Sequence, residues 1–83
     1  MDEQLATFSI HARAMLTERK IEEEWVWRTI NEFDKKETRI DGNFHFFKRI
    51  SENGGRILHV IMNPLASPMK IFTIYFDRHE RKT

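Results

Sequence analysis

The second half of the chain contains three runs rich in β-branched and aromatic residues, separated by clusters of turn-forming residues. The runs cover residues 45–50, 57–62 and 70–76. This composition is typical of β-strands, and each run also carries polar or cationic side chains among its apolar ones. At least one face of the predicted sheet must therefore hold polar groups near water, and we take that face as the first place to look for function.

The first half of the chain predicts two helices. Ser9 is placed to act as the N-cap of a helix of about three turns over residues 10–19. Three glutamates, residues 22–24, then mark the start of a second helix, because the helix dipole favours negative charge in the first turn. This helix is expected to continue to about residue 33 and to pack on the sheet through an apolar stripe formed by Val26, Ile30 and Phe33.

Trp25 and Trp27 flank this stripe on either side. A tryptophan at the rim of the helix can stack on a nucleic acid base or contact a protein partner. It can equally cover the edge of a small hydrophobic core, and we favour this second interpretation because large aromatic residues usually serve packing.

Turn signals define the order of the strands. The charged segment 35–40 is predicted as an edge strand, followed by a hairpin turn at Asp41-Gly42. A second hairpin turn is predicted at residues 53–55, and a longer loop with two prolines at residues 63–68. The predicted fold class is α+β, with two N-terminal helices packed on a four-stranded antiparallel sheet in the order ααββββ.

The length of the turn at residues 53–55 decides which side chains share a face of the sheet. A loop with an even number of residues would place His59 on the face of Phe46 and Lys48, with His45 on the other face. An odd number would re-pair these sets, because a slip of one residue moves every side chain to the opposite face. The sequence leaves open which pairing holds and which face meets water.

Composition limits the protein class. The chain has 83 residues, which form one domain with a core at about 8–78 and tails at 1–7 and 79–83. It has no cysteine, which excludes disulfides and thiolate zinc sites and fits a reducing cytoplasm. The N-terminus lacks a signal-like apolar run, and no stretch of ~18 apolar residues could span a membrane. We therefore expect a soluble, cytoplasmic protein with no membrane partner.

The charge is unevenly distributed along the chain. Residues 1–43 contain seven Lys or Arg and ten Asp or Glu, whereas residues 44–83 contain seven and three. A basic strand half is suited to a phosphate-facing surface. Ordinary solubility charge is the alternative, and composition alone favours it.

Five short motifs follow one another along the chain: Ser9-Ile-His11-Ala12, Glu18-Arg19-x-Ile21, His45-Phe46-Phe47-Lys48, Leu58-His59-Val60 and Thr73-Ile-Tyr75. In their order and spacing, over residues 8–78, the chain resembles a family of small bacterial proteins catalogued as domain of unknown function 4258. Members of that family often have an arginine where this chain has Met15 and a glycine where it has Lys20.

That family is similar to the wider RelE-like group of barnase, EndoU and colicin domains, many of which are metal-independent ribonucleases that act as toxins. The resemblance implies a helix-then-sheet fold with an RNA-facing surface. It does not by itself confer activity, because function depends on the site and not on the fold.

Metal-independent RNA cleavage needs a general base, a general acid and cations over the developing phosphorane charge. Imidazole titrates near neutrality, so we expect His11 and His45 to divide the acid and base roles, with Tyr75 donating a proton or stacking. This hypothesis requires both histidines to open onto one cleft. The candidate substrate-binding residues are Arg19, Lys48, Arg49, Thr73 and Arg78.

Each of these residues also has a purely structural interpretation, as a helix cap, a half-buried strand residue or a solvated charge. The histidines show no ligand spacing, and there is no glycine-rich phosphate loop and no Gly-x-Ser-x-Gly motif, so no metal or cofactor is expected.

Two main functional hypotheses follow. The first is a small RelE-like ribonuclease of the toxin type, restrained by an antitoxin-like protein partner. The second is a non-catalytic module that uses the same sheet face to hold RNA or a protein. A third, less supported option is a structural subunit that docks through the Trp25 or Trp27 edge.

Overall fold

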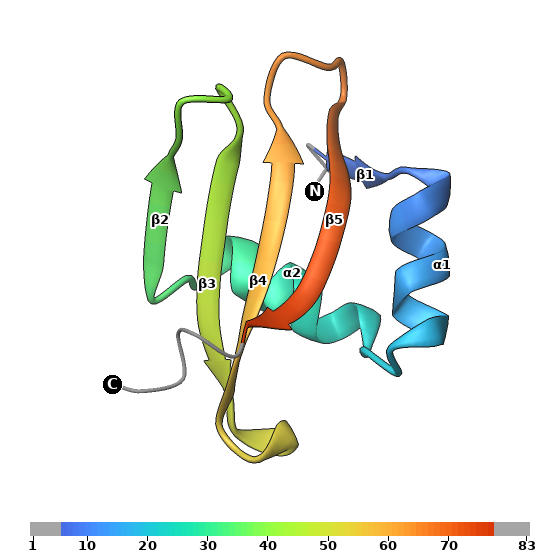
Figure 1. Ribbon diagram of the computed structural model, residues 1–83, viewed down its shortest axis with the longest axis vertical. Helices are drawn as coiled ribbons and strands as arrows, with labels where there is room; N and C mark the ends of the chain where they lie inside the picture. Colours follow the sequence, from blue (N-terminus) through green and yellow to red (C-terminus); the bar gives the residue numbers. More distant parts are fainter. Residues whose placement is uncertain (1–5, 78–83) are drawn as a thin grey trace.

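Five strands form one sheet; the second helix crosses one of its faces, and the first helix lies along one side of the sheet (Figure 1). The computed structural model describes residues 6–77. The elements are β1 (Ala6–Phe8), α1 (Ile10–Glu18), α2 (Glu23–Asn31), β2 (Lys35–Thr38), β3 (Phe44–Ile50), the 3-10 turn η1 (Ser51–Asn53), β4 (Arg56–Asn63) and β5 (Met69–Asp77). The order across the sheet is β1-β5-β4-β3-β2, and the α+β class is confirmed.

The predicted four-stranded antiparallel sheet was wrong by one strand. Ala6 and Thr7, which were predicted to belong to the tail at 1–7, form strand β1 together with Phe8; this strand pairs in parallel with Met69–Ile71 of β5. The other neighbouring strands pair antiparallel, so the sheet is mixed. A strand of three residues is too short to show alternation, and its partner lies at the far end of the chain, so sequence patterning gave no sign of it.

Helix α1 begins and ends as a well-capped helix. The Ser9 hydroxyl accepts a hydrogen bond from the backbone of Ala12 at 3.0 Å, as the N-cap prediction requires. At the other end, the backbone N–H of Ile21 donates to the Leu16 carbonyl at 2.9 Å, which is the pattern of a Schellman motif. Lys20, which lies between the C-cap residue Arg19 and Ile21, adopts φ 55°, a left-handed conformation that favours glycine.

The hydrophobic core lies between the helices and the sheet. Within residues 6–77, seven of its apolar side chains are completely buried: Ala12, Val26, Ile50, Leu58, Val60, Ile71 and Ile74. The predicted stripe of the second helix is only partly confirmed, because α2 ends at Asn31 and Phe33 is 44% exposed beyond it.

Both tryptophans pack at the edge of the core. Trp25 meets Phe76 edge to face at 6.1 Å between ring centroids, and Trp27 meets Phe8 at 5.2 Å. The structure therefore favours packing over an exposed stacking role.

Among residues 6–77, neither helix has the length and apolar character that crossing a membrane would require.

The connection between β3 and β4 sets which residues share a face. Ile50 pairs with Arg56, so the loop has five residues, an odd number. Phe47 consequently pairs with His59, and Phe46 with Val60. Of the two pairings that the sequence allowed, the odd one is present. The face turned away from the helices, here called the open face, carries His45, Phe47, Arg49, Ile57, His59 and Ile61.

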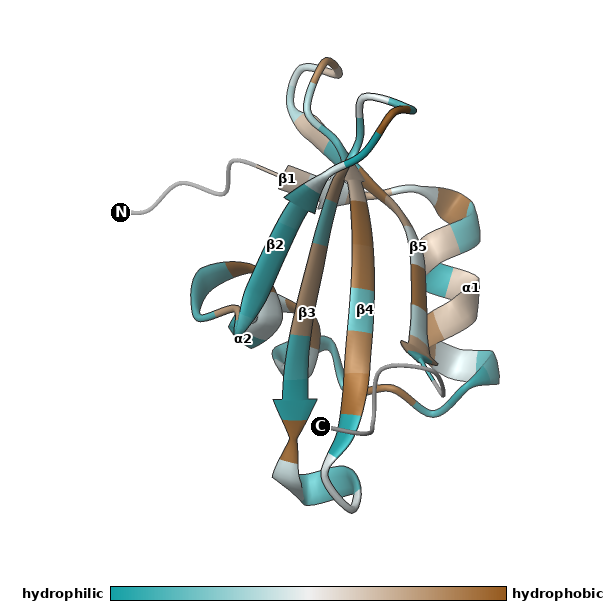
Figure 2. Cartoon of the chain, turned by 60° about the vertical axis from the view of Figure 1, so that its left-hand side comes forward, coloured by the Kyte–Doolittle hydropathy of each residue, from teal (hydrophilic) through white to brown (hydrophobic). Residues whose placement is uncertain are grey.

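Strand β2 closes the sheet as a charged edge strand, as predicted. Figure 2 shows it as a hydrophilic strand beside the more apolar β3 and β4. Its turn into β3 uses Gly42 at φ 83°, and the Asp41 carboxylate accepts a hydrogen bond from the backbone of Asn43 at 2.8 Å. The predicted hairpin at Asp41-Gly42 is therefore confirmed.

Candidate functional site

Two histidines form a hydrogen-bonded pair on the open face. His45 of β3 and His59 of β4 approach to 2.9 Å between Nδ1 and Nε2, and only 4% and 2% of their surfaces are exposed. They are diagonal neighbours in the ladder, because His59 pairs directly with Phe47. Imidazole rings are long enough to meet across such a diagonal. We call His45 and His59 the histidine couple.

A carboxylate lies beyond each outer nitrogen of the histidine couple. Asp41, in the turn between β2 and β3, places Oδ2 3.5 Å from Nε2 of His45. Asp77, the last residue of β5, places Oδ2 3.4 Å from Nδ1 of His59. These distances exceed those of a good N–H···O hydrogen bond, so the carboxylates act as charge neighbours of the rings. Four side chains thus follow one another as carboxylate, imidazole, imidazole and carboxylate.

The two ends of this row differ in their access to water. The side chain of Asp41 is 49% exposed, whereas that of Asp77 is 12% exposed. Protons and polar ligands therefore meet the row first at Asp41, next to the buried Nε2 of His45.

One protonation pattern gives each ring nitrogen a complementary neighbour. In it, His45 carries both protons, donates from Nδ1 to His59, and turns its second N–H toward Asp41. His59 is neutral and turns its single N–H toward Asp77. Burial first, and then the charge of His45, lower the pKa of His59 to about 4, while Asp77 opposes the shift. The lowered pKa keeps His59 as the neutral ring of the couple near neutral pH.

Aromatic rings and cations surround the histidine couple. The ring of His59 lies 4.2 Å from that of Phe47 and 4.9 Å from that of Tyr75. The ammonium of Lys35 lies 4.5 Å over Phe47 and pairs with Glu37 at 3.6 Å. Arg39 pairs with the same carboxylate at 2.7 Å. Positive charge near the couple is therefore largely balanced by carboxylates, and this part of the face is less basic than the strand half suggested.

Four of the predicted site residues lie on the open face. His45 and Tyr75 are brought together through His59, which contacts both rings. Thr73 pairs with Ile61 in the ladder and so lies on the same face. Arg49 also lies there and is exposed, and its guanidinium donates to the Gly55 carbonyl at 2.8 Å.

The remaining predicted residues lie elsewhere. His11 is exposed on α1, a helix that packs against β1 and β5, whereas His45 is buried on β3, which β4 separates from β5. Arg19 donates to the Ile74 carbonyl of β5 at 2.9 Å. Lys48 lies on the helix side and meets Asp34 at 3.5 Å. Arg78 lies outside the described residues. The pairing of His11 with His45 is thus not formed in this structure.

Sequence reasoning missed His59 as the partner of His45. In sequence it is one more polar residue in a strand. The signal that would have found it is the odd loop of residues 51–55, which places both imidazoles on one face. Within residues 6–77, no group of three or more His, Asp or Glu side chains is arranged to hold a metal ion.

The fold and the site define a small α+β domain with a helical layer on one sheet face and a buried histidine couple on the other. The chain belongs to the family described as domain of unknown function (DUF4258), whose family model matches residues 8–76. No curated protein and no solved structure matches the chain. The family expected from the five motifs is therefore confirmed.

Proposed function

We propose that this protein is a small, metal-independent ribonuclease of the RelE-like toxin type that acts on cytoplasmic RNA from its open face. The observation that carries the proposal is the 2.9 Å hydrogen bond of the histidine couple, with the Tyr75 ring against His59. Titratable groups held in contact, one of them with a strongly shifted pKa, are typical of acid–base sites. The resemblance of the sequence motifs to a family expected to be related to RelE-like domains supplies RNA as the proposed substrate class.

In the proposed reaction, the ribose 2′-oxygen attacks the neighbouring phosphorus while the bond from phosphorus to the 5′-oxygen breaks. His45 takes the 2′-hydroxyl proton at Nε2, the nitrogen nearest to the exposed Asp41, so this step starts from His45 with that nitrogen unprotonated. Tyr75 gives a proton to the leaving 5′-oxygen. The products are a 2′,3′-cyclic phosphate and a free 5′-hydroxyl, and Arg49 on the same face is the candidate phosphate contact.

RNA cleavage in the presence of EDTA tests this proposal. The wild type should generate 2′,3′-cyclic phosphate ends, and His45→Ala should lower the rate by about a hundredfold or more, as expected for loss of a general base. His11→Ala is the matched control, because His11 is exposed on α1 and is not part of the histidine couple. Intact RNA with EDTA and with magnesium, or equal cleavage by all variants, would rule out this site as catalytic.

A non-catalytic binding module is the second candidate, and burial of the histidine couple favours it. Both imidazoles are almost fully buried, and their outer nitrogens face carboxylates. In this case the couple only fixes the β3 and β4 pairing, and the open face holds RNA or an antitoxin-like protein.

This candidate predicts salt-sensitive RNA binding without cleavage. Arg49→Ala should weaken binding, whereas Lys48→Ala should not, because the neighbouring Lys48 points to the helix side. Equal effects of the two substitutions would contradict binding through the open face.

A further inference from the structure

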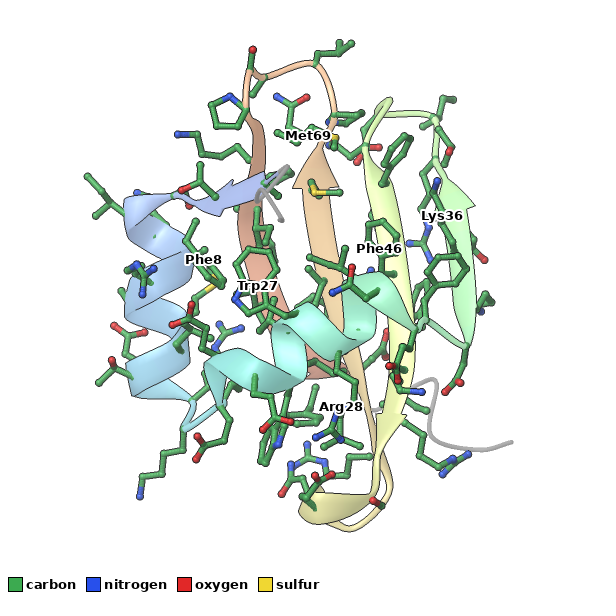
Figure 3. All side chains as sticks on the ribbon, turned by 180° about the vertical axis from the view of Figure 1, so that it is seen from behind. Phe8, Trp27, Arg28, Lys36, Phe46 and Met69 are labelled. Atoms are coloured by element: carbon green, nitrogen blue, oxygen red, sulfur yellow. The ribbon has the colours of Figure 1, made fainter. Side chains whose placement is uncertain are left out.

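A concave site lies on the helix side of the sheet, away from the histidine couple. It is a cavity of about 520 Å³ between the C-terminal half of α2 and the strands. Figure 3 shows Trp27, Phe46, Lys36 and Met69 around it, where α2 leaves part of the sheet uncovered. The volume lies within the range of small-molecule sites, about 300–1,000 Å³. We call it the apolar cavity.

Aromatic rings and methionines form the walls of the apolar cavity. The ring of Phe46 lies 5.5 Å from that of Phe33 and 6.2 Å from that of Phe44. Met62 and Met69 also line the cavity. Aromatic rings favour edge or offset contacts with another ring, and methionine side chains adapt to the shape of a ligand. These walls suit a flat, apolar body.

Of the described residues that line the apolar cavity, Lys36 is the single ionised one. Its ammonium lies 4.1 Å from the ring centroid of Phe44 and 5.7 Å from that of Phe46. Among residues 6–77, no carboxylate lies within ion-pair distance of this ammonium, whereas the adjacent Lys35 pairs with Glu37 at 3.6 Å. Within the described part of the chain, the cavity therefore presents a positive charge that no carboxylate balances, beside an apolar interior.

We infer that the apolar cavity binds an amphipathic aromatic monoanion, with its ring system among the phenylalanines and its carboxylate on the Lys36 ammonium. An apolar ligand without charge would leave the ammonium unpaired, and a cationic ligand would be repelled by it. The amide of Asn31 also lines the cavity and offers a second polar contact. This site is independent of the proposed ribonuclease activity, because the sheet separates the two.

Calorimetric titration with 2-naphthoate and its neutral isostere 2-naphthamide tests the inference. We expect saturable binding of 2-naphthoate and binding of 2-naphthamide that is about tenfold weaker, the difference expected for a charge-assisted contact. Lys36→Gln should weaken 2-naphthoate about tenfold and leave 2-naphthamide unchanged. Lys35→Gln is the matched control and should change neither titration, because that side chain lies over Phe47 on the open face.

A second variant tests the apolar part of the site. Phe33→Ala removes a partly exposed ring that lies beyond α2, so the fold should be retained. It should weaken both naphthalene probes by a similar factor. The inference is overturned if 2-naphthoate shows no saturable binding, or if both probes bind equally and Lys36→Gln has no effect.

The apolar cavity could instead be filled by a second copy of the chain. Sedimentation of the free protein over a range of concentrations tests this alternative. A monomer at all concentrations is the result expected for a ligand cavity. Self-association that Phe33→Ala abolishes, together with no binding of 2-naphthoate, would overturn the inference and identify the cavity as a protein interface.

Discussion

Lys35 and Lys36 are consecutive residues of β2, yet their side chains serve opposite faces of the sheet. The ammonium of Lys35 lies over Phe47 beside the histidine couple and pairs with Glu37. The ammonium of Lys36 lies over Phe44 at the apolar cavity, with no carboxylate beside it within residues 6–77. The same residue type thus belongs to a charge-balanced network on one face and to an apolar site with one cation on the other.

The comparison extends across the sheet. Lys48 and Arg49 also separate to the two faces, as do Ile57 and Leu58. Because side chains alternate along a strand, the environment of each residue depends on whether its position is odd or even. Basic composition of the strand half therefore does not make either face basic, and the register decides what each face can do.

Truncation of neighbouring residues on β4 should give the largest contrast between the faces. Leu58 is completely buried against the helices, so Leu58→Ala should lower the free energy of unfolding by about 3 kcal/mol. Ile57 is 8% exposed on the open face, which neither α1 nor α2 covers, and Ile57→Ala should cost clearly less. Urea denaturation of both variants measures the difference. Equal losses would mean that the open face is packed as tightly as the helix side.

Acidification should act through the open face. Burial lowers the pKa of His59 to about 4, so the folded state resists protonation of a ring that the unfolded chain protonates near pH 6.5. This contribution is fully present above about pH 6.5 and is lost as the pH falls toward 4, by up to about 3 kcal/mol.

His59→Leu should flatten this pH dependence of the unfolding free energy, and denaturation at several pH values measures it. His11→Gln replaces an exposed histidine of α1; it is the control and should leave the curve unchanged. A wild type that keeps its stability between pH 6.5 and 4 would contradict the assignment of His59 as a buried neutral ring.

A substitution away from both faces should raise stability without changing either site. Lys20 holds a left-handed conformation at the end of α1, which costs a residue with a side chain about 1 kcal/mol relative to glycine. Lys20→Gly should therefore raise Tm by about 4–8 °C, and Lys20→Val should lower it. Thermal unfolding followed by circular dichroism gives the answer, and a lower Tm for Lys20→Gly would contradict the strain argument.

The smallest effect on stability is expected for the two lysines of β2. Lys35→Gln and Lys36→Gln each change an exposed side chain and should alter the free energy of unfolding by no more than about 0.5 kcal/mol. Chemical denaturation checks this. If either variant loses more, its effect on ligand binding has to be separated from partial unfolding.

Local signals in the sequence were sufficient for most of the fold. The Ser9 cap, the glutamates at the start of α2 and the Asp41-Gly42 turn each act over a few residues, and each is found where predicted. Strand β1 was missed because its existence depends on a partner at the other end of the chain.

The candidate site was harder to predict than the fold. His45 and Tyr75 were named, but the residue that joins them, His59, was not, because the pairing depends on whether the loop after Ile50 has an odd or even length. Arg19 and Lys48 were expected at a phosphate site. Their side chains instead satisfy groups on the scaffold, a choice set by tertiary contacts that residue type does not reveal.

The hydrogen bond from Arg19 to the Ile74 carbonyl bears on how the molecule behaves in crowded solution. β1 pairs only with Met69–Ile71, so it does not cover the edge of β5 beyond Ile71, here called the margin of β5. The Arg19 guanidinium already occupies a carbonyl there. An incoming strand from another molecule would have to displace a charged group to extend the sheet, so this margin is protected against fibre-like growth.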